Sequence, residues 1–150
     1  EIIKNKYNVV LQLTNGYISS NIQFGSVALA FDGDKTSTSP DNAITFRSDD
    51  LNSYIGCTYA EDVTPYKYDI TIMGYGSAGN YSVILQGQNA DNSWESIGEE
   101  HILTTKGNGS ASYGENIDYS FDVTTNKKYK GLRIINNYIN HSNNFYCIDI

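Results

Sequence analysis

An acidic turn near the start of the chain holds the side chains best suited to bind a ligand. Two aspartates, Asp32 and Asp34, flank Gly33 at the end of a short apolar run. Glycine reaches positive φ at little cost, and aspartate side chains bond to nearby backbone N–H groups, so the tripeptide indicates a tight turn. Two carboxylates two residues apart also suit a hard cation such as calcium, which takes about six to eight oxygen ligands. Both interpretations stay open: a plain turn, or a turn that holds a cation.

Elsewhere no group of residues has the context of a catalytic site. The 17 Asp and Glu residues belong to no helical metal-binding motif, and there is no Gly-x-Ser-x-Gly turn. Cys57 and Cys147 are 90 residues apart with no Cys-x-x-Cys, which does not indicate zinc. Each lies in a strand-like run, which favours two buried thiols over a disulfide, although both remain open. We therefore expect no enzymatic activity.

These residues must be positioned by strands, because apolar side chains recur at every second position and nowhere with a long helical period. The alternating runs are 9–13, 68–72, 81–85, 119–123 and 131–134. Segments rich in Gly, Asn and Asp separate them, at 74–80, 89–93, 106–116, 124–128 and 136–144. One helical turn is expected around 26–30. Strands at this spacing predict an all-β fold, an antiparallel sandwich or barrel.

Composition limits the partners of the chain. Only 18% of residues are charged, yet mean hydropathy is −0.42, so neutral polar groups dominate, among them 17 Asn and 13 Tyr. Amides, hydroxyls and tyrosine rings recognise neutral polar molecules, sugars above all, although an AT-rich genome gives the same bias. A net charge of −7 argues against nucleic acid, because no basic stripe replaces phosphate counterions. The one basic cluster, Lys127, Lys128 and Lys130, is interpreted as a solvated edge.

Length and termini indicate a module. The 150 residues fit a single domain over 1–150 that buries about two thirds of its unfolded surface. No apolar run approaches the roughly 18 residues of a membrane span, so we expect no membrane insertion. The chain begins with Glu1 rather than Met, and we expect it to be part of a larger multidomain polypeptide.

Four motifs, taken in order, resemble discoidin-like domains, a family of β-sandwich modules that includes the family 32 carbohydrate-binding modules. They are Ala-Phe-Asp-Gly-Asp at 30–34, the stretch 81–94 that ends in Trp94, Lys-Gly-Leu-Arg-Ile at 130–134, and the last run, 145–150. The resemblance covers about residue 26 to the end, and residues 1–25 align poorly. It implies a galactose-binding-domain-like fold, a single-domain antiparallel β-sandwich of the jelly-roll type.

The resemblance also implies a structural calcium ion. Its ligands would be the backbone carbonyls of Leu29 and Ile148 and the side chains of Asp32, Asp34, Ser37 and Asp149. Such an ion would clip the last strand onto a loop more than a hundred residues earlier, and so stabilise the fold by linkage without doing chemistry. The alternative is a hydrated loop that aspartate–backbone hydrogen bonds hold alone.

In the sugar-binding members of this family, loops at one end of the sandwich bind the ligand near the metal. An aromatic ring stacks on the sugar while polar side chains bond its hydroxyls. The matching residues here are Arg47, Asp49, Tyr75, His141, Asn144 and Phe145, with Phe145 as the stacking ring. Core packing for Phe145 and an ion pair for Arg47 are the ordinary alternatives.

The resemblance thus implies a lectin-like, non-catalytic module that binds a neutral glycan or glycoconjugate, located outside the cell or on its surface. The alternative function is a phage or viral attachment module, in a tail fibre or capsid, with the same sandwich on the virion surface. A glycan partner fits both.

Overall fold

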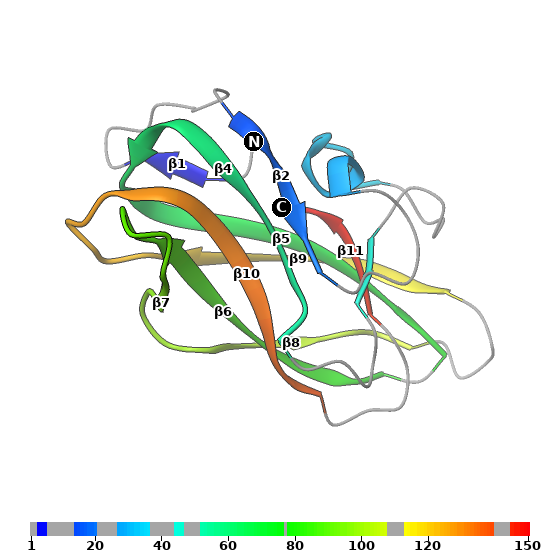
Figure 1. Cartoon of the computed structure of the whole chain (residues 1–150). Helices are drawn as coiled ribbons and strands as arrows, with labels where there is room; N and C mark the ends of the chain where they lie inside the picture. Colours follow the sequence, from blue (N-terminus) through cyan, green and yellow to red (C-terminus); the bar gives the residue numbers. More distant parts are fainter. Residues whose placement is uncertain are drawn as a thin grey trace.

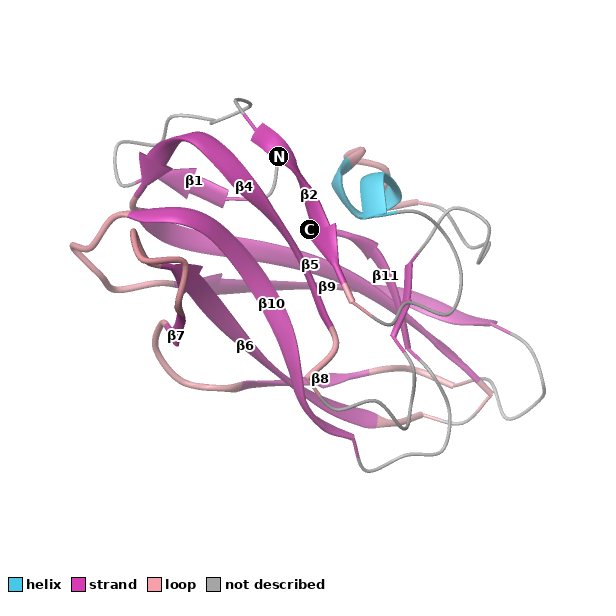
Figure 2. Ribbon diagram, viewed as in Figure 1, coloured by secondary structure: helices cyan, strands magenta, loops and turns pink. Residues whose placement is uncertain are grey.

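Two antiparallel β-sheets lie face to face in the computed structural model (Figure 1). The structure describes residues 3–5, 14–20, 27–36, 44–46, 52–76, 78–107, 113–139 and 145–150. Within them the regular structure is strand apart from one short 3₁₀ turn, η1 (Val27–Phe31) (Figure 2). The predicted all-β sandwich is therefore confirmed. No helix in these ranges is long and apolar enough to cross a membrane.

The first sheet is built around one long strand, β5 (Pro65–Tyr75). Along one edge it pairs with β9 (Tyr113–Asp122) over almost its whole length. Along the other edge it pairs first with β1 (Ile3–Asn5) and then with β11 (Phe145–Asp149). The outermost strand is β3 (Ile44–Phe46), which pairs with β11. The last strand of the chain thus lies inside the sheet.

The second sheet has β10 (Tyr129–Ile139) at its centre. On one side of β10 lie β4 (Tyr54–Val63) and then β2 (Thr14–Ser19). On the other side lies β6 (Asn80–Gln88), whose free edge is shared by β7 (Trp94–Ser96) and β8 (His101–Thr104).

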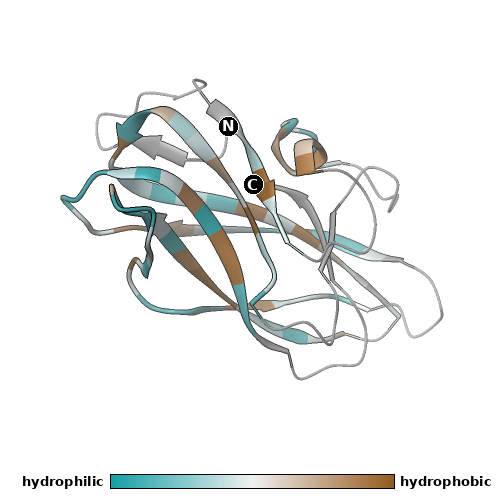
Figure 3. Cartoon of the chain, in the orientation of Figure 1, coloured by the Kyte–Doolittle hydropathy of each residue, from teal (hydrophilic) through white to brown (hydrophobic). Residues whose placement is uncertain are grey.

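The core fills the space between the sheets, as period-2 alternation requires. Along β10, Leu132 and Ile134 are fully buried, whereas Arg133 between them is half-buried on the outer face. This alternation is visible along the strands in Figure 3. The largest buried side chains on the inner faces come from β4, β5, β6, β8 and β10: Ile55, Tyr68, Ile70, Ile72, Tyr81, Leu85, Leu103 and Leu132.

The predicted runs at 68–72, 81–85 and 131–134 are strands, and the helical turn near 26–30 is η1. The run at 119–123 ends one residue early, at Asp122, and the run at 9–13 lies outside the described residues. Three predicted loops are too long, because residues 74–75, 113–116 and 136–139 continue strands. Backbone pairing extends the ladders through polar residues such as Asn116 and Asn136, whose side chains signal turns.

Cys57 is a buried free thiol on β4, so the disulfide alternative is not adopted. Burial raises its pKa to about 11, which suppresses the reactive thiolate.

Candidate functional site

The acidic turn folds as the Asp-Gly-Asp tripeptide predicts. Gly33 has φ of 78°, a conformation that glycine adopts without strain. The Asp32 Oδ1 atom accepts a hydrogen bond from the Asp34 backbone N–H at 2.8 Å. Asp34 Oδ1 accepts bonds from both the backbone N–H and the hydroxyl of Thr36, at 2.8 and 2.7 Å. One oxygen of each carboxylate therefore stabilises the turn.

The C-terminus closes directly onto this part of the chain. The backbone N–H of Ile150 donates to the carbonyl of Ala30 at 2.7 Å, and both residues are buried. The end of β11 is thus held against η1 by the protein itself. Asp149 precedes Ile150, so the backbone brings the last acidic residue to the element that leads into the acidic turn.

A calcium site is compatible with this arrangement but its ligands are not all described. Within the described ranges, no three Asp, Glu, His or Cys side chains come together as a metal site. Ser37 and the side chains of Ile148 and Asp149 fall outside those ranges. The second carboxylate oxygen of Asp32 and the Leu29 carbonyl are oxygen donors of the kind that a hard cation binds.

The predicted sugar-binding residues gather, where the backbone is described, at one end of the sandwich. In the register of the first sheet Phe145 lies opposite Phe46 on β3 and Gly74 on β5. Tyr75 follows Gly74, and Arg47 follows Phe46. The backbone therefore brings together the end of β3, the end of β5 and the start of β11. Arg47, Asp49, His141 and Asn144, and the side chains of Tyr75 and Phe145, lie outside the described residues.

A hollow of about 510 Å³ opens at the same end. Across it, the ammonium group of Lys106 lies 3.1 Å from Glu115 Oε2, in an exposed ion pair. An exposed pair of this kind contributes little to stability and leaves both groups free to bond hydroxyls. The hollow is lined by Ala78, Thr104, Thr105, Lys106, Gly107, Gly114 and Glu115.

Close backbone packing fixes the walls of the hollow. A Cβ atom on Gly114 would stand 1.8 Å from the Lys106 carbonyl, and one on Gly74 would stand 2.6 Å from the Thr105 side chain. The Thr105 backbone N–H donates to the Gly79 carbonyl, and the Thr105 hydroxyl accepts from the Gly79 N–H, at 2.9 and 3.0 Å. Because Gly74 pairs with Phe145 and also touches Thr105, the hollow adjoins the predicted stacking residue.

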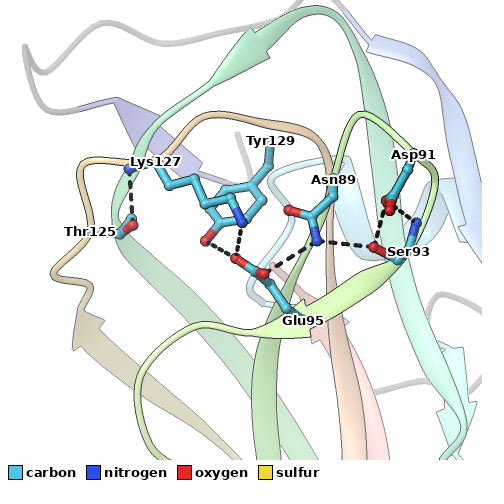
Figure 4. Close-up of polar contacts among 7 residues, drawn as sticks. All are labelled: Asn89, Asp91, Ser93, Glu95, Thr125, Lys127 and Tyr129. Carbon is cyan, nitrogen blue, oxygen red and sulfur yellow. Dashed lines mark hydrogen bonds and ion pairs between the residues drawn. The ribbon is translucent and has the colours of Figure 1, made fainter.

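At the opposite end, a polar network joins the 89–93 turn to the segment before β10 (Figure 4). Glu95 accepts from the Lys127 ammonium at 2.6 Å, from the Tyr129 hydroxyl at 2.9 Å and from the Asn89 amide at 3.2 Å. These hydrogen bonds, above all that from Lys127, hold the pKa of Glu95 below its usual range. Asp91 closes the turn through the Ser93 N–H and hydroxyl. The network is structural: each group bonds within the protein.

Two of the family-like motifs meet on the outer face of the second sheet. The guanidinium carbon of Arg133 lies 4.2 Å from the ring centre of Trp94 and 4.5 Å from that of Tyr54. Its Nε donates to Gln86 Oε1 at 2.8 Å. Burial lowers the pKa of Arg133, which nevertheless stays charged. The motif residues Trp94 and Arg133 are thus joined by one cation–π stack.

The sequence did not indicate the hollow beside Lys106 and Glu115, nor the packing of Tyr54 against Arg133. Lys106 and Glu115 lie in what was expected to be one long loop, and they face each other because the chain leaves β8 of one sheet and enters β9 of the other. Tyr54 has no motif of its own. The position of Arg133 between two buried residues of β10 is the signal that places it on the outer face.

Comparisons with known proteins support the fold. No protein family model and no curated protein sequence matches the chain. Among solved structures, the family 32 module of Clostridium perfringens NanJ, in complex with galactose, matches with a TM-score of 0.55 and 9% identity, over 89% of each chain. A pectin-binding module matches with a TM-score of 0.53 and 12% identity, over 93% of this chain and 89% of that one.

Truncated AlyQ, which holds a family 32 module and an alginate lyase domain, matches with a TM-score of 0.50 and 11% identity. The match spans 91% of this chain and 31% of AlyQ. At these identities the shared feature is the fold, so the chain has a β-sandwich fold like that of these carbohydrate-binding modules.

Proposed function

We propose that the protein is a non-catalytic carbohydrate-binding module that recognises a neutral glycan at the end of the sandwich where β5 leads into β6. The observation that carries this proposal is the register that brings Phe46, Gly74 and Phe145 to one end, beside the hollow. Similar structures include modules that bind galactose and pectin, which supports a sugar as ligand.

The end of the sandwich offers the two kinds of contact that a sugar needs. An aromatic ring from Phe145 or Tyr75 would stack on the C–H face of a pyranose. Lys106 and Glu115, with the exposed Thr104, would bond its hydroxyls from the hollow.

A glycan array followed by titration calorimetry tests the proposal. We expect Phe145→Ala to raise the dissociation constant about ten- to hundredfold, because a stacking contact is worth about 1–3 kcal/mol. Lys106→Ala and Arg47→Ala should also weaken binding. Lys67→Ala is the matched control, since Lys67 pairs with Asp69 on β5 beside β1, away from the hollow.

Two results would contradict the proposal. One is an array on which no glycan binds the isolated protein. The other is a Phe145→Ala variant that melts at a much lower temperature but keeps its affinity per folded molecule, which would make Phe145 a core residue.

We further propose that calcium reinforces the closure of the C-terminus onto η1. The Ile150–Ala30 hydrogen bond supports this by bringing the end of β11 to the acidic turn. Excess chelator should then lower the melting temperature of the wild type, and Asp32→Ala should abolish that response. An unchanged melting temperature would refute the cation and leave the hydrogen-bonded turn as the whole explanation.

The location of such a module follows from its proposed ligand. A glycan binder acts outside the cell or on its surface, commonly beside a further domain, as in AlyQ, where a lyase domain accompanies the module. The non-enzymatic role rests on the module-like fold and on the lack of any catalytic motif in the sequence.

A further inference from the structure

Arg133 keeps hydrogen-bonding capacity that the protein does not use. Its Nε bonds to Gln86, and rings from Trp94 and Tyr54 flank the guanidinium. Within the described residues neither Nη group has a hydrogen-bond partner, and no carboxylate forms an ion pair with Arg133. A guanidinium carries five donors in a rigid planar fork. The fork is therefore preorganised, charged and available at a half-buried position.

Two glycines let the strands beneath this fork pack closely. Gly56 lies directly opposite Arg133 on β4, and a Cβ there would stand 2.7 Å from the Arg133 Cα. Gly131, two residues before Arg133 and on the same face, lies between Thr58 and Gln88 in the register. Gly56 leaves room for Arg133 to pack against the β4 backbone, and Gly131 is enclosed by the Thr58 and Gln88 side chains.

The whole chain carries a net charge of −7, yet two lysines near the Arg133 fork have no carboxylate partner among the described residues. Lys130 bonds to the neutral Asn92 amide oxygen at 2.6 Å, and neither Lys130 nor Lys128 makes an ion pair in the described part of the structure. The Lys127 ammonium alone of this cluster is neutralised, by Glu95.

Glu100 lies at the other end of this face. Glu100 accepts hydrogen bonds from the Ser82 hydroxyl and the Asn137 amide, both at 2.7 Å. Asn137 lies four residues beyond Arg133 on β10, about 13 Å along a strand. Among the described residues, Lys128, Lys130 and Arg133 are therefore cations without an ion-pair partner toward the Trp94 end of the face.

We propose that the outer face of the β2–β4–β10–β6–β7 sheet is a second binding site, for acidic polysaccharide. The Arg133 fork, held between the Trp94 and Tyr54 rings, donates through both Nη groups to the carboxylate of a uronate residue. This site uses a different sheet face and a different ligand charge from the loop-end site, and it does not depend on the proposed function there.

The single tryptophan of the chain gives a direct readout of this site. Titration with polygalacturonate should change the fluorescence of Trp94 in a saturable way and should weaken as salt rises. The fully methyl-esterified polymer has the same backbone without the charge, and should bind at least tenfold more weakly. Dextran sulfate tests whether sulfate replaces carboxylate: binding as tight as that of polygalacturonate would overturn the assignment to uronate.

Arg133→Met tests the fork, because methionine keeps most of the apolar packing and removes every donor. We expect at least a tenfold loss of affinity for polygalacturonate, and a partial loss for Arg133→Lys, which keeps the charge but not the planar fork. Lys67→Met, which removes a cation on the first sheet, should leave this affinity unchanged. All variants are compared below their own melting temperatures.

Substitution of two exposed lysines provides a second test of the site if Arg133→Met does not fold. Lys128→Met and Lys130→Met should each reduce affinity for polygalacturonate a few-fold and flatten its salt dependence. A wild type that does not bind polygalacturonate, or folded Arg133 variants that bind it as the wild type does, would overturn the proposal. Failure of the loop-end site is recognised separately, as the loss of neutral-glycan binding with polygalacturonate binding intact.

Discussion

Replacement of Arg133 by methionine is the most informative test of how the second sheet is held together. The guanidinium loses contact with two rings at 4.2 and 4.5 Å, each worth about 1 kcal/mol at a half-buried site, and a hydrogen bond to Gln86 worth about 1 kcal/mol. Arg133→Met should therefore lower the free energy of unfolding by about 3 kcal/mol. For a domain of this size that corresponds to a fall of about 6–12 °C in melting temperature.

A double-mutant cycle isolates the cation–π part of this loss. Arg133→Met and Trp94→Leu are measured singly and together by urea denaturation, followed by circular dichroism because Trp94 is the only tryptophan. We expect the two changes to be coupled by about 1 kcal/mol, since either one alone abolishes the stack. Additivity within about 0.3 kcal/mol would refute the reasoning and leave Trp94 and Arg133 as independent packing residues.

Three further predictions concern groups that the structure buries or pairs. In a Cys147→Ser variant, Cys57 should react with Ellman's reagent only after unfolding, because burial raises its pKa to about 11; rapid reaction of the folded protein would contradict its buried place. Glu95 has a lowered folded pKa, so its stabilising contribution is present above the ordinary pKa of glutamate and is lost as pH falls through the folded pKa. The acid-induced fall in melting temperature should be shallower in Glu95→Gln than in the wild type, and equal slopes would count against the network with Lys127. Gly56→Ala should cost more than about 2 kcal/mol in chemical denaturation, because a Cβ would stand 2.2 Å from a backbone carbonyl of β10; a neutral effect would show that the strands can separate there.

The sequence predicted the architecture where side chains follow the period of two. Tyr68, Ile70 and Ile72 face the core as their alternation requires, and all three are fully buried. Strand ends were harder, because the ladders continue through Asn116 and Asn136, where backbone pairing with neighbouring strands outweighs local turn propensity. The local sequence does not show which strand will pair with a segment, so the ends of these strands depend on tertiary structure.

The candidate site was predictable only in part, for the same reason. The conformation of Gly33 follows from the tripeptide itself, since positive φ and aspartate–backbone bonds are local properties. The packing of Tyr54 on Arg133 joins two strands that are far apart in the sequence. Residues joined by register rather than by proximity in sequence are those that sequence patterns miss.

The use of hydrogen-bonding groups separates the structural parts of this molecule from those that can meet a ligand. Glu95 receives three hydrogen bonds from Lys127, Tyr129 and Asn89, so this carboxylate serves the fold. Arg133 has the opposite balance: two rings and one glutamine fix its position, while its Nη donors are left without partners among the described residues. Holding a charged group rigidly with its donors free lowers the entropic cost of binding an anion. A flexible surface lysine loses conformational entropy when it binds an anion, whereas a stacked guanidinium is already ordered. Arg133 therefore makes the outer face better suited to bind a carboxylate than Lys128 and Lys130 alone would.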